Sequence, residues 1–190
     1  MTDLKKIIKN AVFQLQDGKT ILYPTDTIWG IGCDALNSTA IQRIFEIKKR
    51  PNKKSVLLLA SSLEMINNYV NTIPEVVPDI IKTENRPLTI IYPGARNLPD
   101  ELIGEDGSIG IRLTRDEFCL DLITRLGKPL VSTSANFSGS PYPVSFEDID
   151  PLLVKQVDYV IPWRQQDKSL HIPSKIIQIK PSGELTVIRE

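Results

Sequence analysis

The sequence contains few of the residues on which many active sites depend. It has one histidine, His171, and two cysteines, Cys33 and Cys119, in 190 residues. The cysteines have no metal-ligand spacing and are too few for a disulfide framework, which excludes a zinc finger and a disulfide-stapled scaffold. A mechanism that needs two histidines is also excluded. We expect both cysteines to be buried, inert thiols.

Net charge, aromatic residues and long apolar runs are scarce as well. The 23 basic residues balance 23 acidic ones, and aromatic residues make up 6%. This balance excludes a nucleic-acid binder that is basic over the whole chain. The longest apolar run has five residues, 56–60, whereas a membrane helix needs about 20. The start, MTDLKKIIKN, has no signal-peptide core, so we expect a cytoplasmic protein with reduced thiols and no membrane partner.

Helix and strand patterns alternate along most of the chain. Apolar residues at helical spacing predict helices over residues 4–15, 38–48, 62–71 and 116–126. Short apolar segments predict strands over 20–23, 55–60, 87–92, 108–113 and 129–134, and a hairpin over 175–189. Ser145 and Asp148 match a capping box before a short helix. No linker divides residues 1–190, so we expect a single α/β domain with a mixed sheet.

A polar segment follows the first predicted strand. The sequence YPTDTIWGIG places Thr25, Asp26, Thr27 and two glycines in what reads as a loop over residues 24–32. Loops at strand ends are common ligand sites in α/β sheets, and threonine hydroxyls suit a small polar substrate. An Asx-type turn built by Asp26 explains the pattern equally well.

A cluster of cations ends the second predicted helix. Residues 48–54, KKRPNKK, contain five cations in seven positions. The helix dipole explains one or two of them. Lys48 and Arg50 have the chemistry to clamp a polyphosphate, with arginine as a bidentate fork. A solvated basic face and a nucleic-acid phosphate contact remain alternatives.

Two further polar features lie on predicted strands. The strand over 129–134 ends in Ser132-Thr133-Ser134-Ala135-Asn136, which suits a ligand pocket or an ordinary polar turn. Arg112 lies within an apolar strand, where a cation needs an anion or carbonyl groups. It is therefore a candidate for a pocket or for a structural ion pair. These residues alone indicate an α/β protein that binds an anionic small molecule.

Three motifs together, YPTDTIWGIGCDA, IKKRP and STSANFSG, resemble the threonylcarbamoyl-AMP synthase family with its YrdC-like domain. The resemblance implies a twisted mixed sheet with flanking helices around a deep groove. It implies a nucleotidyltransferase that joins L-threonine, bicarbonate and ATP, accompanied by Mg²⁺, and releases pyrophosphate. The product, threonylcarbamoyl-AMP, would pass to the threonylcarbamoyl transferase machinery for t6A modification of tRNA, with possible contact between tRNA and this chain. No resident metal site is expected.

The resemblance also implies residue roles. Lys48 and Arg50 are expected to grip the nucleotide phosphates as catalytic residues, with Lys54 assisting. Threonine binding is expected of Thr27, Arg112, Ser134 and Ser174, and nucleotide binding of Arg50, Lys54, Ser108, Asn136 and Arg189. The chain departs from the family pattern at Trp29 (usually tyrosine), Lys49 (usually glycine) and Lys175 (usually threonine). The alternative is a non-catalytic YrdC-like paralogue that binds RNA through residues 48–54.

Overall fold

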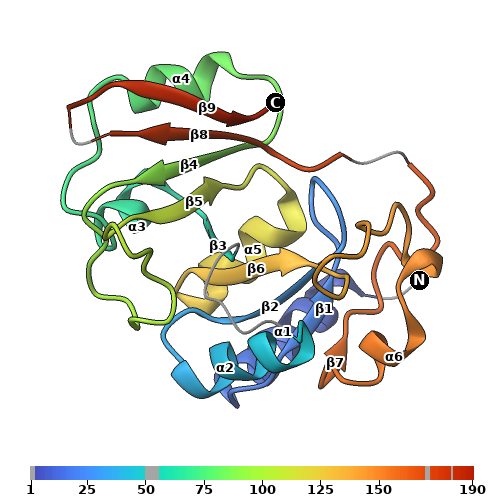
Figure 1. The fold of residues 1–190 in the computed structure, drawn as a ribbon. Helices are drawn as coiled ribbons and strands as arrows, with labels where there is room; N and C mark the ends of the chain where they lie inside the picture. The colour runs from blue at the N-terminus through green and yellow to red at the C-terminus, as the bar shows by residue number, and fades with distance from the viewer. Residues whose placement is uncertain (1–2, 50–55, 170–171, 181) are drawn as a thin grey trace.

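A mixed sheet runs through the molecule in the computed structural model, which describes residues 3–49, 56–169, 172–180 and 182–190. Within these residues nine strands form the sheet in the order β7-β1-β2-β6-β3-β5-β4-β8-β9 (Figure 1). Parallel pairs (β1/β7, β3/β5, β4/β8) interrupt otherwise antiparallel pairing. The strands are β1 Ile21–Tyr23, β2 Gly30–Asp34, β3 Leu57–Ala60, β4 Leu88–Tyr92, β5 Ile109–Leu113, β6 Leu130–Ser134, β7 Tyr159–Val160, β8 Lys175–Ile179 and β9 Leu185–Arg189. The expected α/β fold with a mixed sheet and flanking helices is confirmed.

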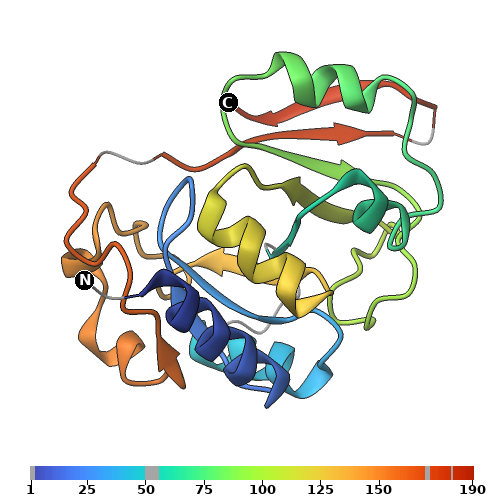
Figure 2. The ribbon, with the colours of Figure 1, turned by 180° about the vertical axis from the view of Figure 1, so that it is seen from behind.

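Amphipathic helices pack on this sheet. Helices α1 and α5 lie side by side over one part of it (Figure 2), and their apolar residues share a core with Ile21, Leu59 and Leu130. A second core contains the buried side of α2 and apolar residues of α3 and α4. The helices are α1 Leu4–Gln16, α2 Ser38–Ile47, α3 Leu63–Asn67, α4 Val77–Thr83, α5 Glu117–Leu126 and α6 Pro151–Val154, with a 3₁₀ turn, η1, at Phe146–Asp148.

Local sequence signals explain several helix ends. Asp116 caps the start of α5 by accepting a hydrogen bond from the Cys119 amide, and Gly127 ends it with φ of 72°. Such a left-handed conformation suits glycine because it has no Cβ. The predicted capping box is present at η1, where Ser145 and Asp148 bond to each other. Asn37 caps α2 by accepting a hydrogen bond from the Ala40 amide.

The largest correction concerns the predicted loop over residues 24–32. Its last three residues belong to strand β2, which begins at Gly30 and pairs with both β1 and β6. Helix α3 ends at Asn67 instead of residue 71, while α4 and β7 were not predicted. Strand β2 was not predicted because two of its five residues are glycines, and only Ile31 and Cys33 show the apolar alternation of a strand. The tight β1–β2 connection is what holds the Thr25–Thr27 segment in place.

The strand register puts a set of polar residues on one face of the sheet. Ser134 pairs with Gly30 and Ser132 with Gly32, and Ser132 also pairs with Leu57 on β3. Arg112 on β5 pairs with Leu59 on one side and Thr89 on the other. Because side chains alternate between faces along a strand, these residues point to the same side. Helices α1 and α5 cover one part of this face, and the uncovered part lines a cavity.

Candidate functional site

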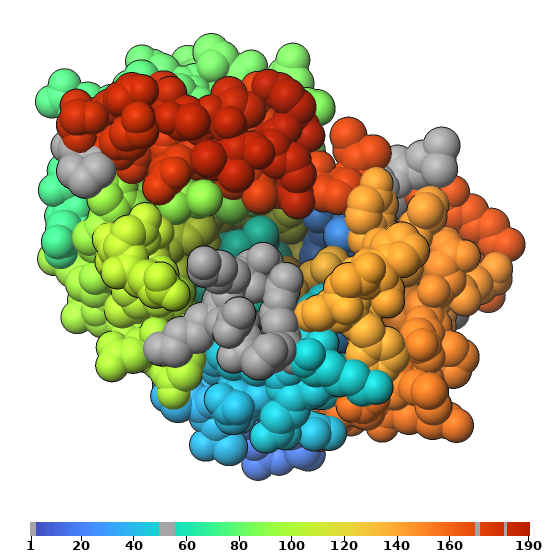
Figure 3. All heavy atoms as spheres, in the orientation of Figure 1, coloured from blue at the N-terminus to red at the C-terminus, as the bar shows by residue number. Residues whose placement is uncertain are grey.

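A cavity of about 1070 Å³ opens on this face of the sheet. This volume is slightly above the range of roughly 300–1,000 Å³ that is typical of ligand pockets. Figure 3 shows the hollow between strands β8 and β9, the segment around residues 100–110, and the segment that follows β6. Its lining combines apolar side chains of β3, β4 and β5 with hydroxyl, amide and guanidinium groups.

The Thr25–Thr27 segment presents its hydroxyls to one end of the cavity. Thr25 Oγ1 accepts a hydrogen bond from the Thr27 amide at 2.9 Å and lies 2.9 Å from Thr27 Oγ1. Thr25 also donates to the Ile28 carbonyl. Thr25 therefore builds the turn, and the Asx-turn interpretation of Asp26 is wrong. Both threonines are buried and both line the cavity.

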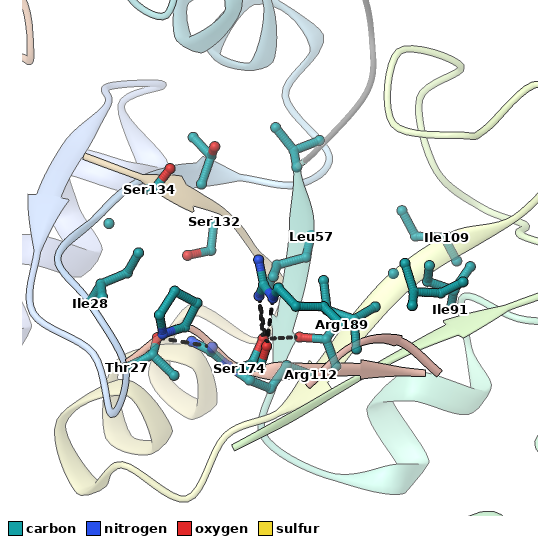
Figure 4. Close-up of a pocket in the computed structure, with 18 of the residues that line it drawn as sticks. Thr27, Ile28, Leu57, Ile91, Ile109, Arg112, Ser132, Ser134, Ser174 and Arg189 are labelled. Carbon is teal, nitrogen blue, oxygen red and sulfur yellow. Dashed lines mark hydrogen bonds between the residues drawn. The ribbon is translucent and has the colours of Figure 1, made fainter. Parts of the chain in front are cut away.

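Arg112 lies on the cavity floor with its guanidinium held from the same loop (Figure 4). Its Nη1 donates to Thr27 Oγ1 at 3.0 Å, and its Nη2 lies 3.3 Å from Asp26 Oδ1. The two alternatives that the sequence left open for Arg112 are thus both present: it lines a pocket, and it forms an ion pair.

Lys48 joins the end of α2 to the loop that follows β6. Its Nζ donates to the Ser134 carbonyl at 2.6 Å and to Asn136 Oδ1 at 3.0 Å, and the side chain is buried. Ser134 Oγ donates to the same Asn136 oxygen, and Asn136 Nδ2 donates to the Ser140 carbonyl. Ser134, Asn136 and Ser140 line the cavity, so the ammonium charge stands directly behind its wall.

Tyr23 supports the neighbouring part of the floor. Its buried hydroxyl donates to Ser132 Oγ at 2.6 Å, and burial raises the pKa of the phenol. The ring crosses β2, where a Cβ added at Gly32 would lie 2.9 Å from Tyr23 Cε1 and 2.5 Å from the Val131 carbonyl oxygen. Gly32 is therefore required by close packing, and this packing fixes the Ser132 hydroxyl that faces the cavity.

The C-terminal strands close another side of the cavity. Arg189 on β9 donates from Nη2 to the Ser174 carbonyl at 2.7 Å, and Ser174 Oγ lies 2.8 Å from Thr89 Oγ1. Partial burial, together with the nearby charge of Arg112, lowers the pKa of Arg189. Two guanidinium groups thus raise the positive potential at this end, which favours an anionic ligand.

The segment before β5 forms a further wall. Ser108 Oγ donates to Asp106 Oδ1 at 2.6 Å, and this hydrogen bond lowers the pKa of Asp106. Both residues line the cavity with Gly104 and Glu105. Among the described residues that line the cavity, Glu105 and Asp106 are the only carboxylates, and both belong to this wall.

The structure brings most of the predicted site residues to one cavity. Those that line it are Thr27, Ser108, Arg112, Ser134, Asn136, Ser174 and Arg189. Lys48 lies against two of them, while Arg50 and Lys54 fall outside the described residues. Sequence analysis missed Thr89 and Tyr142, which also line it. Thr89 on β4 pairs with Arg112 on β5, but the pairing of strands cannot be predicted from one sequence.

The departures from the family pattern have local explanations. Trp29 is buried, and its ring centroid lies 4.9 Å from that of Phe146. Lys49, at the position usually held by glycine, has a φ of 51°, a conformation that glycine adopts readily. Its Nζ lies 4.8 Å above the Phe137 ring. Lys175 forms ion pairs with Glu84 and Glu190.

Three further features concern metal binding, membrane-spanning helices and the cysteines. Within residues 3–49, 56–169, 172–180 and 182–190, no group of three or more His, Cys, Asp or Glu side chains is arranged to hold a metal ion. No helix in the same ranges is long and apolar enough to cross a membrane. Both cysteines are free and buried, as expected, and burial raises the pKa of each thiol.

Comparison with known proteins places the chain in a family. The model for Sua5, YciO and YrdC, described as telomere recombination, matches residues 14–190. The chain belongs to the Sua5/YciO/YrdC family. The threonylcarbamoyl-AMP synthase of Xanthomonas euvesicatoria pv. vesicatoria is 35% identical over 85% of this chain and 87% of its own length. That of Vibrio cholerae serotype O1 is 32% identical over 96% of each.

Solved structures of the family share the fold. E. coli YciO superposes with a TM-score of 0.81 and 26% identity, covering 99% of this chain and 90% of its own. P. abyssi Sua5 complexed with L-threonine gives a TM-score of 0.80 at 28% identity, over 93% of this chain. The chain spans about half of that Sua5 chain, 51%. The resemblance drawn from the three motifs is thereby confirmed.

Proposed function

We propose that this chain is an L-threonylcarbamoyladenylate synthase, a nucleotidyltransferase that forms threonylcarbamoyl-AMP and pyrophosphate from L-threonine, bicarbonate and ATP. The observation that carries the proposal is the single cavity at which the Thr25–Thr27 loop, Arg112 and the Ser134–Asn136 segment meet. Relatives named threonylcarbamoyl-AMP synthase match most of the chain. A family member was solved with L-threonine bound.

The amino acid is assigned to the end of the cavity near Arg112. The guanidinium would bind the threonine carboxylate, because arginine offers paired N–H donors to carboxylate oxygens. The hydroxyls of Thr27, Ser134 and Ser174 would complete the threonine site. The supporting geometry is the 3.0 Å hydrogen bond between Arg112 and Thr27, together with the Ser174 hydroxyl at the adjoining wall.

The nucleotide is assigned to the rest of the cavity. Lys48, Arg50 and Lys54 would neutralise its phosphates, and Ser108, Asn136 and Arg189 would contact the nucleotide. Apolar residues Leu102, Ile103 and Ile109 give the base an apolar surface. The buried Lys48 ammonium supports this arrangement, since it is fixed behind Ser134 and Asn136 by three hydrogen bonds.

The chemistry needs no dedicated base from the chain. The deprotonated amine of threonine combines with bicarbonate, releasing water and forming an N-carboxylate. An oxygen of this carboxylate then attacks the α-phosphorus of ATP, and the bond to the β-phosphate oxygen breaks to release pyrophosphate. The chain accelerates the attack by holding both reactants in one cavity and by neutralising charge that develops on the phosphates. Mg²⁺ would be held by the phosphates, because the described residues offer no metal-binding cluster.

The setting of the reaction is part of the proposal. The product would be consumed by a threonylcarbamoyl transferase that modifies tRNA, and the chain would act in the cytoplasm. We also propose a contact between tRNA and the basic segment over residues 48–54, which the activity does not require. Binding of tRNA through phosphates would weaken steeply as salt is added.

The test is to incubate the protein with ATP, bicarbonate and each amino acid in turn. We expect pyrophosphate and an acyl-adenylate to form with threonine, and only when bicarbonate is present. Salt-sensitive tRNA binding without threonine-dependent pyrophosphate release would contradict the proposal and favour the RNA-binding paralogue.

A further inference from the structure

Asp26 occupies an unusual position behind the cavity floor. It follows Thr25 in the β1–β2 connection, yet its side chain does not line the large cavity. It lines a separate cavity of about 220 Å³ with Pro87, Leu88 and Leu113. Its one described ion pair is with Arg112, whose guanidinium faces the large cavity. Through this ion pair, Asp26 can act on a ligand in the large cavity without contacting it.

The Asp26–Arg112 pair is more deeply buried than an ordinary stabilising ion pair. The side chains are 18% and 4% exposed. Asp26 Oδ1 and Arg112 Nε are both buried without a hydrogen-bond partner among the described residues. Desolvating two charges with incomplete hydrogen bonding offsets most of their attraction, so such a pair adds little to stability. A gain in stability therefore does not account for this pair, whereas the orientation of Arg112 does.

The contacts of Arg112 define that orientation. Nη1 is directed to Thr27 Oγ1 and Nη2 to Asp26 Oδ1, so consecutive residues of one loop engage both terminal nitrogens of the guanidinium. The backbone of Arg112 is fixed in β5 between Leu59 and Thr89. With the strand and both nitrogens fixed, the plane of the guanidinium is set before any ligand arrives, and a preset donor loses less freedom on binding.

We infer that Asp26 is a positioning residue for amino-acid recognition: its carboxylate orients Arg112 so that the guanidinium discriminates in favour of an amino acid with a free carboxylate. This inference rests on the proposed function, because it takes threonine as the ligand of Arg112. It assigns to Asp26 no contact with substrate and no role in the transfer to ATP.

The experiment compares binding of L-threonine and L-threoninamide by calorimetry. The amide lacks the carboxylate, so the ratio of the two dissociation constants reports how well Arg112 recognises it. We expect the isosteric Asp26→Asn to reduce this ratio about ten- to hundredfold, because it removes the buried negative charge that holds Nη2 of Arg112 in place. Binding of L-threoninamide and the KM for ATP should change little, which a general loss of structure would not produce.

A matched control is available at Asp34. Its buried carboxylate forms an ion pair at 2.6 Å with Lys128, whose side chain is partly exposed, and Asp34 lines neither cavity. Asp34→Asn should therefore lower stability without changing the discrimination ratio. A folded Asp26→Asn protein that keeps the wild-type ratio would overturn the inference.

A second variant covers the case in which Asp26→Asn does not fold. Asp26→Glu keeps the charge but moves the carboxylate by one methylene, so the ratio should fall to a value between those of the wild type and the Asn variant. A folded Asp26→Glu protein with the wild-type ratio would show that the position of the carboxylate does not matter, and would overturn the inference. Failure of the wild-type protein itself to bind threonine would instead contradict the proposed function.

Discussion

One face of the central sheet is divided into a covered half and an open half. Under α1 and α5 the face carries Ile21, Leu59 and Leu130, which are fully buried in an apolar core. Only two residues beyond Leu130, Ser132 faces the cavity, and Arg112 does so from the strand next to Leu59. The backbone pairing is continuous across the boundary. One continuous sheet thus supplies both the stability of the fold and the spacing of the site.

This division predicts that variants in the two halves will fail in different ways. Removing an apolar side chain from the covered half should lower the free energy of unfolding and spare substrate affinity. Removing a polar group from the open half should lower activity with a smaller effect on folding.

Lys48→Met should have the largest effect on activity. It removes a buried ammonium behind Ser134 and Asn136, and with it the charge proposed to neutralise the phosphates. We expect adenylate formation to fall about 100- to 1,000-fold, measured as threonine-dependent pyrophosphate release. Lys49→Met is the matched control, since the neighbouring side chain is exposed and lies over Phe137. Equal activity in the two variants would contradict the role of Lys48.

Leu59→Ala should have the largest effect on stability. Leu59 is fully buried under α5, so we expect a loss of about 2–5 kcal/mol from the transfer free energy and the cavity left behind. Urea unfolding measures this loss, and the KM for threonine should stay near the wild-type value. Ser134→Ala should show the reverse pattern. A stable Leu59→Ala protein with impaired binding would break the proposed division.

Two glycines allow a smaller, paired test. At Gly32 an added Cβ would lie 2.5 Å from the Val131 carbonyl oxygen, whereas at Gly110 its nearest neighbour would be 3.6 Å away. Gly32→Ala should therefore lower the free energy of unfolding by about 1–3 kcal/mol through overpacking. Gly110→Ala should leave folding nearly unchanged and raise the KM of a substrate, because the new methyl group enters the cavity floor. Equal unfolding midpoints for the two variants would be inconsistent with the close β2 packing.

The smallest expected effect is a decline in stability at alkaline pH. Burial raises the pKa of the Cys33 and Cys119 thiols and of the Tyr23 phenol in the folded protein. The unfolded chain therefore loses these protons first, at pH values of about 8.5–10. The contribution to stability is complete below that range and is lost as the pH rises toward the folded values. Urea midpoints at pH 7.5 and 10 measure the slope, which Cys33→Ala with Cys119→Ala should reduce.

Sequence alone predicted the strongly periodic elements and the main motifs. Helices α1, α2 and α5 follow from apolar spacing and clear ends, and the motif containing Thr27 follows from its hydroxyls. It did not predict β2, because Gly30 and Gly32 serve the packing of Tyr23, a contact between strands that no local pattern records. For the same reason the partner of Arg112 was left open, since the ion pair with Asp26 forms only when β5 meets the β1–β2 connection.

The most direct test of the proposed function compares threonine with valine, which has the same shape but no hydroxyl. The candidate pocket is rich in hydroxyl groups, including Thr25, Thr27, Ser132 and Ser134. A site built to bond a substrate hydroxyl rejects an analogue without it, because its own polar groups are left unpaired. At fixed ATP and bicarbonate, we expect pyrophosphate release to favour threonine over valine by about 10⁴-fold, with serine between them. Equal turnover of valine and threonine would contradict the account.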